Sequence, residues 1–158
     1  MRNNDLLRSL RWTLDASEAR MAAIFALGDA EVEKVQIESW LKREEEPSFT
    51  PCPDSLAAAF LAGLIIQKRG PSDKKQPPVR NLGNNLILKM LRIAFTLRDD
   101  DLAAILRAGG FPLNKSEISA LFRTDDHPNY RPCGDQVLRN FLRGLALRER
   151  PGAAAHPG

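Results

Sequence analysis

The stretch Pro51-Cys-Pro-Asp-Ser-Leu-Ala-Ala-Ala-Phe-Leu-Ala-Gly-Leu64 returns 81 positions later as Pro132-Cys-Gly-Asp-Gln-Val-Leu-Arg-Asn-Phe-Leu-Arg-Gly-Leu145. The match extends without a gap from residues 3–70 onto residues 84–151, and 20 of the 68 aligned pairs are identical. The chain therefore contains one unit twice. A unit of this size buries only a marginal core by itself. We therefore expect the two repeats to pack as one body with an approximate internal two-fold axis.

Capping residues and apolar periodicity predict four helices in each repeat. Asn3 or Asn4 is expected to cap the first helix and Ser17 the second, which stops at Gly28, where a left-handed residue suits a helix end. In the second repeat, Asn114 begins a capping box. The segments expected in the first repeat are residues 5–14, 17–28, 33–43 and 54–70.

The fourth helix of each repeat is expected to begin at an aspartate, Asp54 or Asp135, because a carboxylate is stabilised at a helix N-terminus. Pro47 and Pro128 prevent the third helices from continuing. No stretch alternates with the period of a strand. The predicted fold class is all-α, with two tandem four-helix repeats and about eight helices.

The segments outside the repeats have a different composition. Residues 71–83 form a basic linker rich in Pro and Gly that contains Lys74, Lys75 and Arg80, and we expect it to be solvated. Residues 152–158 are predicted to form a disordered tail. Repeat one has 8 Lys and Arg against 11 Asp and Glu, whereas repeat two has 11 against 8. Attraction for a polyanion is therefore expected in the linker and the second repeat.

The chain shows no membrane or export signal. Its N-terminal residues lack the apolar stretch of a signal peptide. The longest apolar run, residues 56–66, is shorter than the ~20 residues needed to span a bilayer. We expect a soluble cytoplasmic protein without a membrane association.

Several segments resemble the YehS-like family, a bacterial family that carries a domain of unknown function twice. The resemblance rests on residues 3–11, 24–28, 40–42 and 133–142, and it covers both repeats. It implies a bacterial protein of about this length, and it implies no activity, cofactor or site residue.

The second and third helices of each repeat could form a helix-turn-helix, with Gly28 or Gly109 in the turn. Two features favour ordinary helix packing. The connection between the helices is longer than the usual turn, and Glu33 and Glu38 of the first copy would repel phosphates. The second copy is the better candidate, with Lys115, Ser116, Ser119, Arg123 and Thr124 as its polar residues.

Cys52 and Cys133 occupy equivalent positions in the two repeats, each two residues before an aspartate. A helix N-terminus can lower the pKa of a thiol, but the neighbouring carboxylate opposes that effect. We interpret both as free, buried thiols that fill a turn, and we leave a reactive thiol as a minor alternative. A metal site that combines both cysteines with His127 and a carboxylate has no supporting ligand spacing, so neither a metal nor a cofactor is expected.

Paired cations lie on the first helix of both repeats: Arg8 and Arg11, and Lys89 and Arg92. Such a pair can hold a phosphate or a carboxylate. It can equally cover apolar surface or bridge to an acidic neighbour such as Asp15. We favour the structural role and keep the pairs as candidate anion contacts.

The two fourth helices differ at aligned positions. Repeat two has Arg139 and Arg143, spaced as an exposed basic strip, where repeat one has Ala58 and Ala62. The helix of repeat one is apolar nearly all round, which predicts burial on every side. The second repeat or a second chain is expected to cover this face, so a homodimer stays open. Its residues are Ala58, Ala62, Ile65 and Ile66.

No phosphate loop, nucleotide fingerprint or hydrolase triad is present in the sequence, and an enzyme is therefore not expected. The predicted function is a non-enzymatic binding or adaptor role in the bacterial cytoplasm, with another protein as partner. The alternative is nucleic-acid association through the basic second repeat and linker. A small enzyme or sensor that uses the paired cysteines is the third hypothesis.

Overall fold

A computed structural model describes residues 1–72 and 78–152 of the chain. The part that it describes contains eight α-helices and no strand, which confirms the all-α fold class. The helices are α1 (Asn3–Leu14), α2 (Glu18–Leu27), α3 (Lys34–Leu41), α4 (Asp54–Arg69), α5 (Asn84–Ala94), α6 (Asp99–Ala108), α7 (Lys115–Leu121) and α8 (Asp135–Glu149).

The repeat in the sequence is also a repeat in the structure. Each helix of the second repeat begins 81 residues after its counterpart in the first. The chain divides into two compact units after Leu82. The packing of the repeats into one body stays a prediction. Lys74, Lys75 and the tail residues 153–158 lie outside the described residues.

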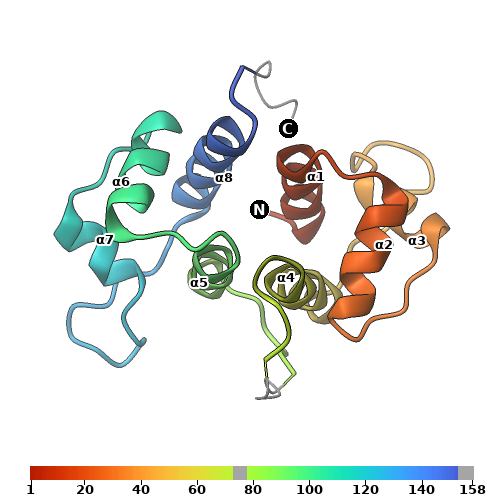
Figure 1. Ribbon diagram of the computed structural model, residues 1–158, viewed down its shortest axis with the longest axis horizontal. Helices are drawn as coiled ribbons and strands as arrows, with labels where there is room; N and C mark the ends of the chain where they lie inside the picture. The colour runs from red at the N-terminus through yellow and green to blue at the C-terminus, as the bar shows by residue number, and fades with distance from the viewer. Residues whose placement is uncertain (73–77, 153–158) are drawn as a thin grey trace. The chain divides into compact units, whose positions relative to one another are not determined.

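In the first unit, α2 packs across α4, and α3 packs against both α2 and α1 (Figure 1). The Phe25 ring joins these elements, with its centroid 5.6 Å from that of Trp40 and 5.0 Å from that of Phe60. These side chains and the apolar faces of the helices form the core of this unit. Its other large, fully buried members are Leu6, Leu7, Leu10, Met21, Ile24, Ile37, Leu61 and Leu64.

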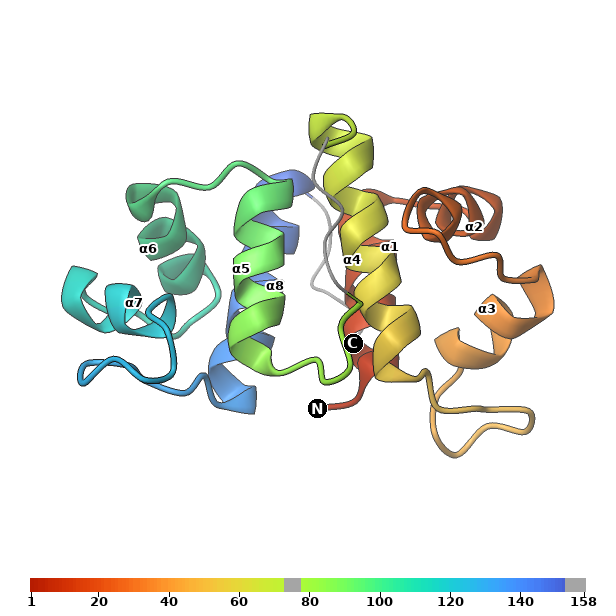
Figure 2. The same cartoon turned by 90° about the horizontal axis from the view of Figure 1, so that it is seen from below.

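The second unit repeats this arrangement, with α6 against α8 and the short α7 beside α6 (Figure 2). Phe141 takes the place of Phe60, and Leu121 that of Trp40. The buried side chains are mostly leucine and isoleucine: Leu88, Leu91, Leu102, Ile105, Leu106, Ile118, Leu121, Leu138, Leu142 and Leu145.

Several predicted helix boundaries are confirmed. The Ser17 side chain accepts a hydrogen bond from the Arg20 N–H at 3.1 Å, which caps α2. Asn114 accepts from the Glu117 N–H at 2.8 Å and begins α7 as a capping box. The fourth helices begin at Asp54 and Asp135 as expected.

The predicted cap of the first helix is wrong. Asn3 and Asn4 lie inside α1, and its N-cap is Arg2, whose N–H donates to the Asp5 carboxylate at 3.0 Å. The two asparagine side chains instead bond to residues far along the chain, as described below. The third helix is also shorter than expected, since α3 ends at Leu41.

The left-handed conformation expected at Gly28 is also wrong, because its φ is −87°. This residue is glycine because two helices touch there. A Cβ on Gly28 would lie 1.9 Å from the Ala59 carbonyl oxygen of α4, and a Cβ on Gly63 would lie 1.8 Å from the Ile24 carbonyl oxygen of α2. Each glycine therefore lets the backbone of one helix meet the backbone of the other.

The second repeat makes the same contact. A Cβ on Gly109 would lie 1.9 Å from the Asn140 carbonyl oxygen, and one on Gly144 would lie 1.9 Å from the Ile105 carbonyl oxygen. The two equivalent glycine pairs thus allow backbone contact between α2 and α4 in the first unit and between α6 and α8 in the second.

Candidate functional site

The asparagine pair at the start of each repeat closes a loop. Both side-chain N–H groups of Asn4 donate to backbone carbonyls, at 2.9 Å to Trp40 and at 2.9 Å to Thr50. Its side-chain oxygen accepts from the Cys52 N–H at 3.1 Å. Asn4 is 1% exposed. One buried amide therefore ties together the two ends of the loop that leads from α3 to α4.

Asn3 holds the start of α4. Its amide donates to the Cys52 carbonyl at 2.9 Å and to the Asp54 carboxylate at 2.7 Å. Asp54 also accepts from the Leu82 N–H at 2.9 Å. That backbone hydrogen bond and then the bond from Asn3 lower the pKa of the Asp54 carboxyl. Leu82 is thus bonded to the first unit and belongs to it, although this end of the linker was expected to be solvated.

The second repeat contains the same network. Asn85 donates to the Leu121 carbonyl at 2.9 Å and to the Arg131 carbonyl at 3.0 Å, and it accepts from the Cys133 N–H at 2.9 Å. Asn84 donates to the Asp135 carboxylate at 2.8 Å. Both copies therefore use the same polar residues to hold the backbone.

The two cysteines are buried and free of a disulfide. Burial, and then the charge of Asp54, raises the pKa of the Cys52 thiol to about 12. Burial, and then the charge of Asp135, raises the pKa of the Cys133 thiol to about 11. Thiols with such pKa values carry little thiolate at neutral pH. In the part of the chain that the structure describes, no group of three His, Cys, Asp or Glu side chains is arranged to hold a metal ion.

The cations of the first helices contact nearby protein groups. Arg8 donates to the Lys42 carbonyl at 3.0 Å and pairs with the Asp5 carboxylate. Arg11 donates from Nε to the Ala16 carbonyl at 3.4 Å. Both guanidinium groups therefore help to hold the first unit.

In the second repeat, Arg92 pairs with Asp99 at 3.0 Å and lies over the Phe122 ring, 4.9 Å from its centroid. Lys89 is exposed. The geometry of Arg92, like that of Arg8 and Arg11, matches the structural role that the sequence favours.

The geometry of α6 and α7 departs from a helix-turn-helix. Six residues, 109–114, separate the two helices, and α7 has 7 residues. Arg123 and Thr124, expected on a recognition helix, lie in the loop after α7. The connection is thus longer than the usual three- or four-residue turn of that motif.

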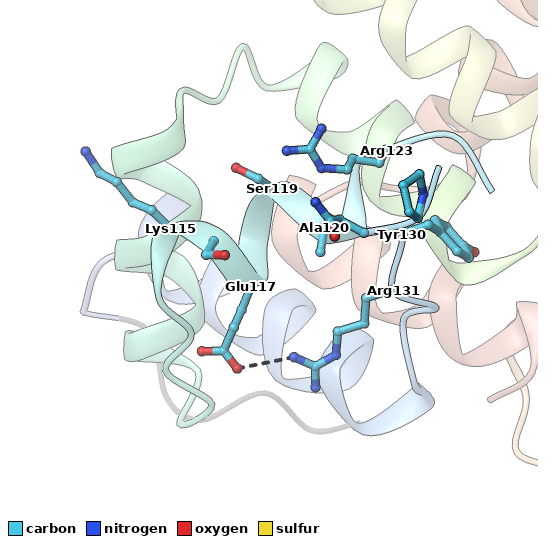
Figure 3. Close-up of a pocket in the computed structure, with 10 residues that line it drawn as sticks. Lys115, Glu117, Ser119, Ala120, Arg123, Tyr130 and Arg131 are labelled. Carbon is cyan, nitrogen blue, oxygen red and sulfur yellow. Dashed lines mark hydrogen bonds and ion pairs between the residues drawn. The ribbon is translucent and has the colours of Figure 1, made fainter. Parts of the chain in front are cut away.

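The α7 helix and the loop that follows it surround an open hollow of about 730 Å³ (Figure 3). In the close-up, Arg123, Ala120 and Tyr130 border one end of the hollow, and the Lys115 side chain extends away at the other. Arg131 pairs with Glu117 at 3.3 Å. The residues that line the hollow are Lys115, Ser116, Glu117, Ser119, Ala120, Arg123, Pro128, Asn129, Tyr130 and Arg131.

Six residues of this hollow were not predicted as site residues: Glu117 and Ala120 on α7, and Pro128, Asn129, Tyr130 and Arg131 in the loop after it. The four loop residues lie in a segment without helical periodicity, so only a comparison of the repeats could have indicated them. Arg131 replaces Thr50, which in the first repeat lies 2.7 Å from the Ser39 hydroxyl oxygen.

The remaining predicted cations lie apart in the sequence from this hollow. Arg139 and Arg143 are exposed on α8, spaced one helical turn apart as expected. Arg80 is exposed in the linker. Lys74 and Lys75 belong to the segment outside the described residues.

On α4, no residue from Leu56 to Ile66 is exposed. Ala58 is 4% exposed, and Ala62, Ile65 and Ile66 are half-buried. The identity of the group that covers this face stays a prediction.

Comparisons with known proteins identify the family. The model of a family described as protein of unknown function, DUF1456, matches residues 3–70 and again residues 84–151. The chain is also 48% identical over 152 residues to the uncharacterized protein YehS of Escherichia coli (strain K12), a match that covers 94% of this chain and 97% of the relative. The chain belongs to this family, which confirms the resemblance seen in its sequence. No solved structure matches it.

The described helices include none that is both long and apolar enough to cross a membrane.

Proposed function

We propose that this protein is a non-enzymatic binding or adaptor protein of the bacterial cytoplasm and that its partner is another protein. The observation that carries this proposal is that the two repeats share an interior and differ in surface charge. The side chains of Asn4 and Asn85 hold the backbone in both copies, beside the buried Cys52 and Cys133. Their thiols have pKa values raised to about 12 and about 11.

The difference in surface suits an adaptor. The α3 helix of the first unit exposes Glu38 and is preceded by the exposed Glu33, whereas the corresponding residues of the second unit are Ser119 and Asn114. Charges at the rim of an interface set which partner binds and how fast it associates. One scaffold with an acidic and a basic copy can therefore engage two different surfaces.

Affinity capture tests this proposal. The whole protein serves as bait in a lysate of its own source, with and without nuclease, and captured proteins are identified and then purified. We expect direct binding of a purified partner that survives nuclease. Reversing the charge of Glu33 and Glu38 to Lys should weaken binding of a basic partner. The absence of any direct, nuclease-resistant partner would contradict the proposal.

The hollow of the second repeat favours a second candidate, a nucleic-acid-associated protein. Its exposed Arg123 and Lys115 lie on the basic copy, which can take the negative charge of phosphates. A binding assay with duplex and single-stranded probes tests this candidate. It compares the whole protein with a variant in which six cations are changed to Ser. Those cations are Lys74, Lys75, Arg80, Arg123, Arg139 and Arg143.

The expected result is binding that falls steeply with salt and is lost in the six-residue variant. Binding that survives the six changes would place the contact elsewhere. The failure of the unmodified protein to bind either probe at low salt would remove this candidate.

A further inference from the structure

His127 and Arg123 bring two hydrogen-bond donors together in the loop after α7. The Asn129 backbone N–H donates to His127 Nδ1 at 3.0 Å, and Arg123 Nη1 lies 3.3 Å from His127 Nε2. A neutral imidazole has one donor nitrogen and one acceptor nitrogen. Because Nδ1 is the acceptor here, the ring proton belongs on Nε2. A guanidinium offers donors only, so two N–H groups face each other and neither can accept from the other.

An oxyanion can satisfy both donors, because one oxygen beside the pair accepts from both nitrogens once the Arg123 side chain turns slightly away from the ring. We propose that Arg123 and His127 bind a phosphate of a single-stranded nucleic acid and that the Tyr130 ring receives the neighbouring base. Arg123 is exposed and can reach a ligand in the hollow, and Tyr130 is half-buried in its wall. Figure 3 shows Arg123 and Tyr130 at the same end of this hollow.

The combination of an aromatic ring with cations distinguishes a single strand from other anions. Unpaired bases stack on aromatic side chains while cations follow the backbone, and this mode of binding tolerates many sequences. A duplex keeps its bases stacked and needs an element that enters a groove, and α7 is followed at once by the loop. An acidic peptide supplies carboxylates but no base to cover Tyr130.

The first repeat lacks this site although it has the same fold. Lys42 takes the position of Arg123, and Glu46 that of His127. The Glu46 carboxylate accepts from the Arg43 N–H at 3.1 Å. A negatively charged group therefore occupies the position that the imidazole has in the second repeat. An anion would be repelled there, and the first repeat therefore supplies matched controls.

The inference deepens the nucleic-acid candidate and is independent of a protein partner. Its test is fluorescence anisotropy with a labelled oligonucleotide of about 12 nucleotides, within the usual range of single-strand sites. The whole protein is compared with Arg123→Gln, His127→Ala, Tyr130→Leu and the control Lys42→Gln, which removes one charge from the first repeat. A melting curve of each variant shows that it is folded.

We expect Arg123→Gln to weaken binding about tenfold and to reduce the slope of log affinity against log salt by about 0.7, the value for one phosphate contact on a single strand. Tyr130→Leu should weaken binding by a similar factor with an unchanged slope, because it removes a base contact and no charge. Lys42→Gln should leave affinity within about twofold. The same sequence as a duplex should bind more weakly.

Unchanged binding by Arg123→Gln and His127→Ala would overturn this site while leaving nucleic-acid association elsewhere on the chain intact. No binding of either strand form by the unmodified protein would overturn both the site and the nucleic-acid candidate. A glutamate-rich peptide that displaces the oligonucleotide at equal concentration would show that the hollow recognises acidic protein segments instead, which also overturns it.

Discussion

Replacing Gly28 with alanine should destabilise the first unit strongly. The added Cβ would lie 1.9 Å from the Ala59 carbonyl oxygen and 3.1 Å from the Gly63 nitrogen, whereas ordinary Cβ contacts begin at 3.4 Å. The backbones of α2 and α4 would therefore have to separate by about 1.5 Å. Neither atom can rotate away, because both belong to the backbone of α4.

The magnitude follows from three effects. Overfilling a packed contact costs about 1–3 kcal/mol, and a backbone clash lies at the upper end of that range. A gap of ~1 Å already removes up to half of the dispersion attraction between facing atoms. Alanine can adopt the φ of −87° without strain. Because alanine also makes the unfolded chain less flexible, it offsets ~0.4–1 kcal/mol of the lost stability. We expect a net loss of about 2 kcal/mol or more and a melting temperature lower by ~8–16 °C.

Urea unfolding followed by tryptophan fluorescence measures this change in the first unit alone. Both tryptophans of the chain, Trp12 and Trp40, belong to that unit. Trp40 is 4% exposed, so its emission should shift when the unit unfolds. The matched control is Gly134→Ala in the second unit, followed by circular dichroism beside Gly109→Ala of the same unit, since a Cβ on Gly134 meets nothing within 4 Å. Gly134 precedes α8, and the small loss of cap preference should roughly cancel the gain from a stiffer unfolded chain.

The equivalent change in the second repeat, Gly109→Ala, should cost a similar amount, measured by circular dichroism. Combining Gly28→Ala with Gly63→Ala should cost less than the sum of the single changes, because one separation of the helices relieves both clashes. A loss below about 0.5 kcal/mol for Gly28→Ala, equal to that of an ordinary surface change, would refute the close crossing as the reason for this glycine.

Three further predictions test other parts of the scaffold. Asn4→Ala should cost about 3 kcal/mol in urea unfolding and Asn85→Ala less, because buried backbone groups that lose their partner cost ~1–3 kcal/mol each and Asn85 is only half-buried; equal stability to wild type would contradict the network. Cys52 and Cys133 should label slowly with a thiol reagent at neutral pH. Because folding raises both pKa values from 9.0 to about 12 and about 11, their contribution to stability is full below pH 9 and is lost as the pH rises through the folded values; rapid labelling at pH 7 would revive a reactive thiol. Ala58→Arg should lower the melting temperature or dissociate an oligomer, since a buried unpaired guanidinium is costly, and unchanged melting temperature and solution mass would show that this face is open.

The helices and their repeat could be predicted because the signals for them are local. Ser17 and Asn114 cap the residues that follow within one turn, and the aspartates at 54 and 135 mark the starts of α4 and α8. Each signal depends only on residues that are close together in the chain. A gap-free repeat then shows every boundary twice, so an error in one copy can be detected in the other.

The roles of the repeated glycines and asparagines could not be predicted, because their partners are remote. Asn4 bonds to backbone 36 and 46 residues away, and Gly28 touches α4, 31 residues further along. From the sequence alone, a helix cap is a reasonable interpretation of Asn4, and a helix end is a reasonable interpretation of Gly28. Repetition showed that these residues matter, but only the packed structure shows what they touch.

For the same reason, only part of the candidate site could be predicted from the sequence. Arg123 was selected by its charge, but it was expected on a helix, whereas α7 ends at Leu121. His127 was considered as a metal ligand, and its ring instead accepts from the Asn129 N–H. Charge can be read from sequence, while the direction of a donor depends on the turns of the loop.

The scaffold and the candidate surface meet at one side chain. Asn85 bonds to the carbonyls of Leu121 and Arg131, which are the two ends of the loop that contains Arg123 and His127. Asn4 closes the equivalent loop of the first repeat in the same way. Because both ends are held by a single amide, residues between them can change without loss of the fold. The paired hydrogen bonds of this asparagine thus explain how each unit could keep its interior while single loop positions diverged, such as Glu46 in the first repeat and His127 in the second.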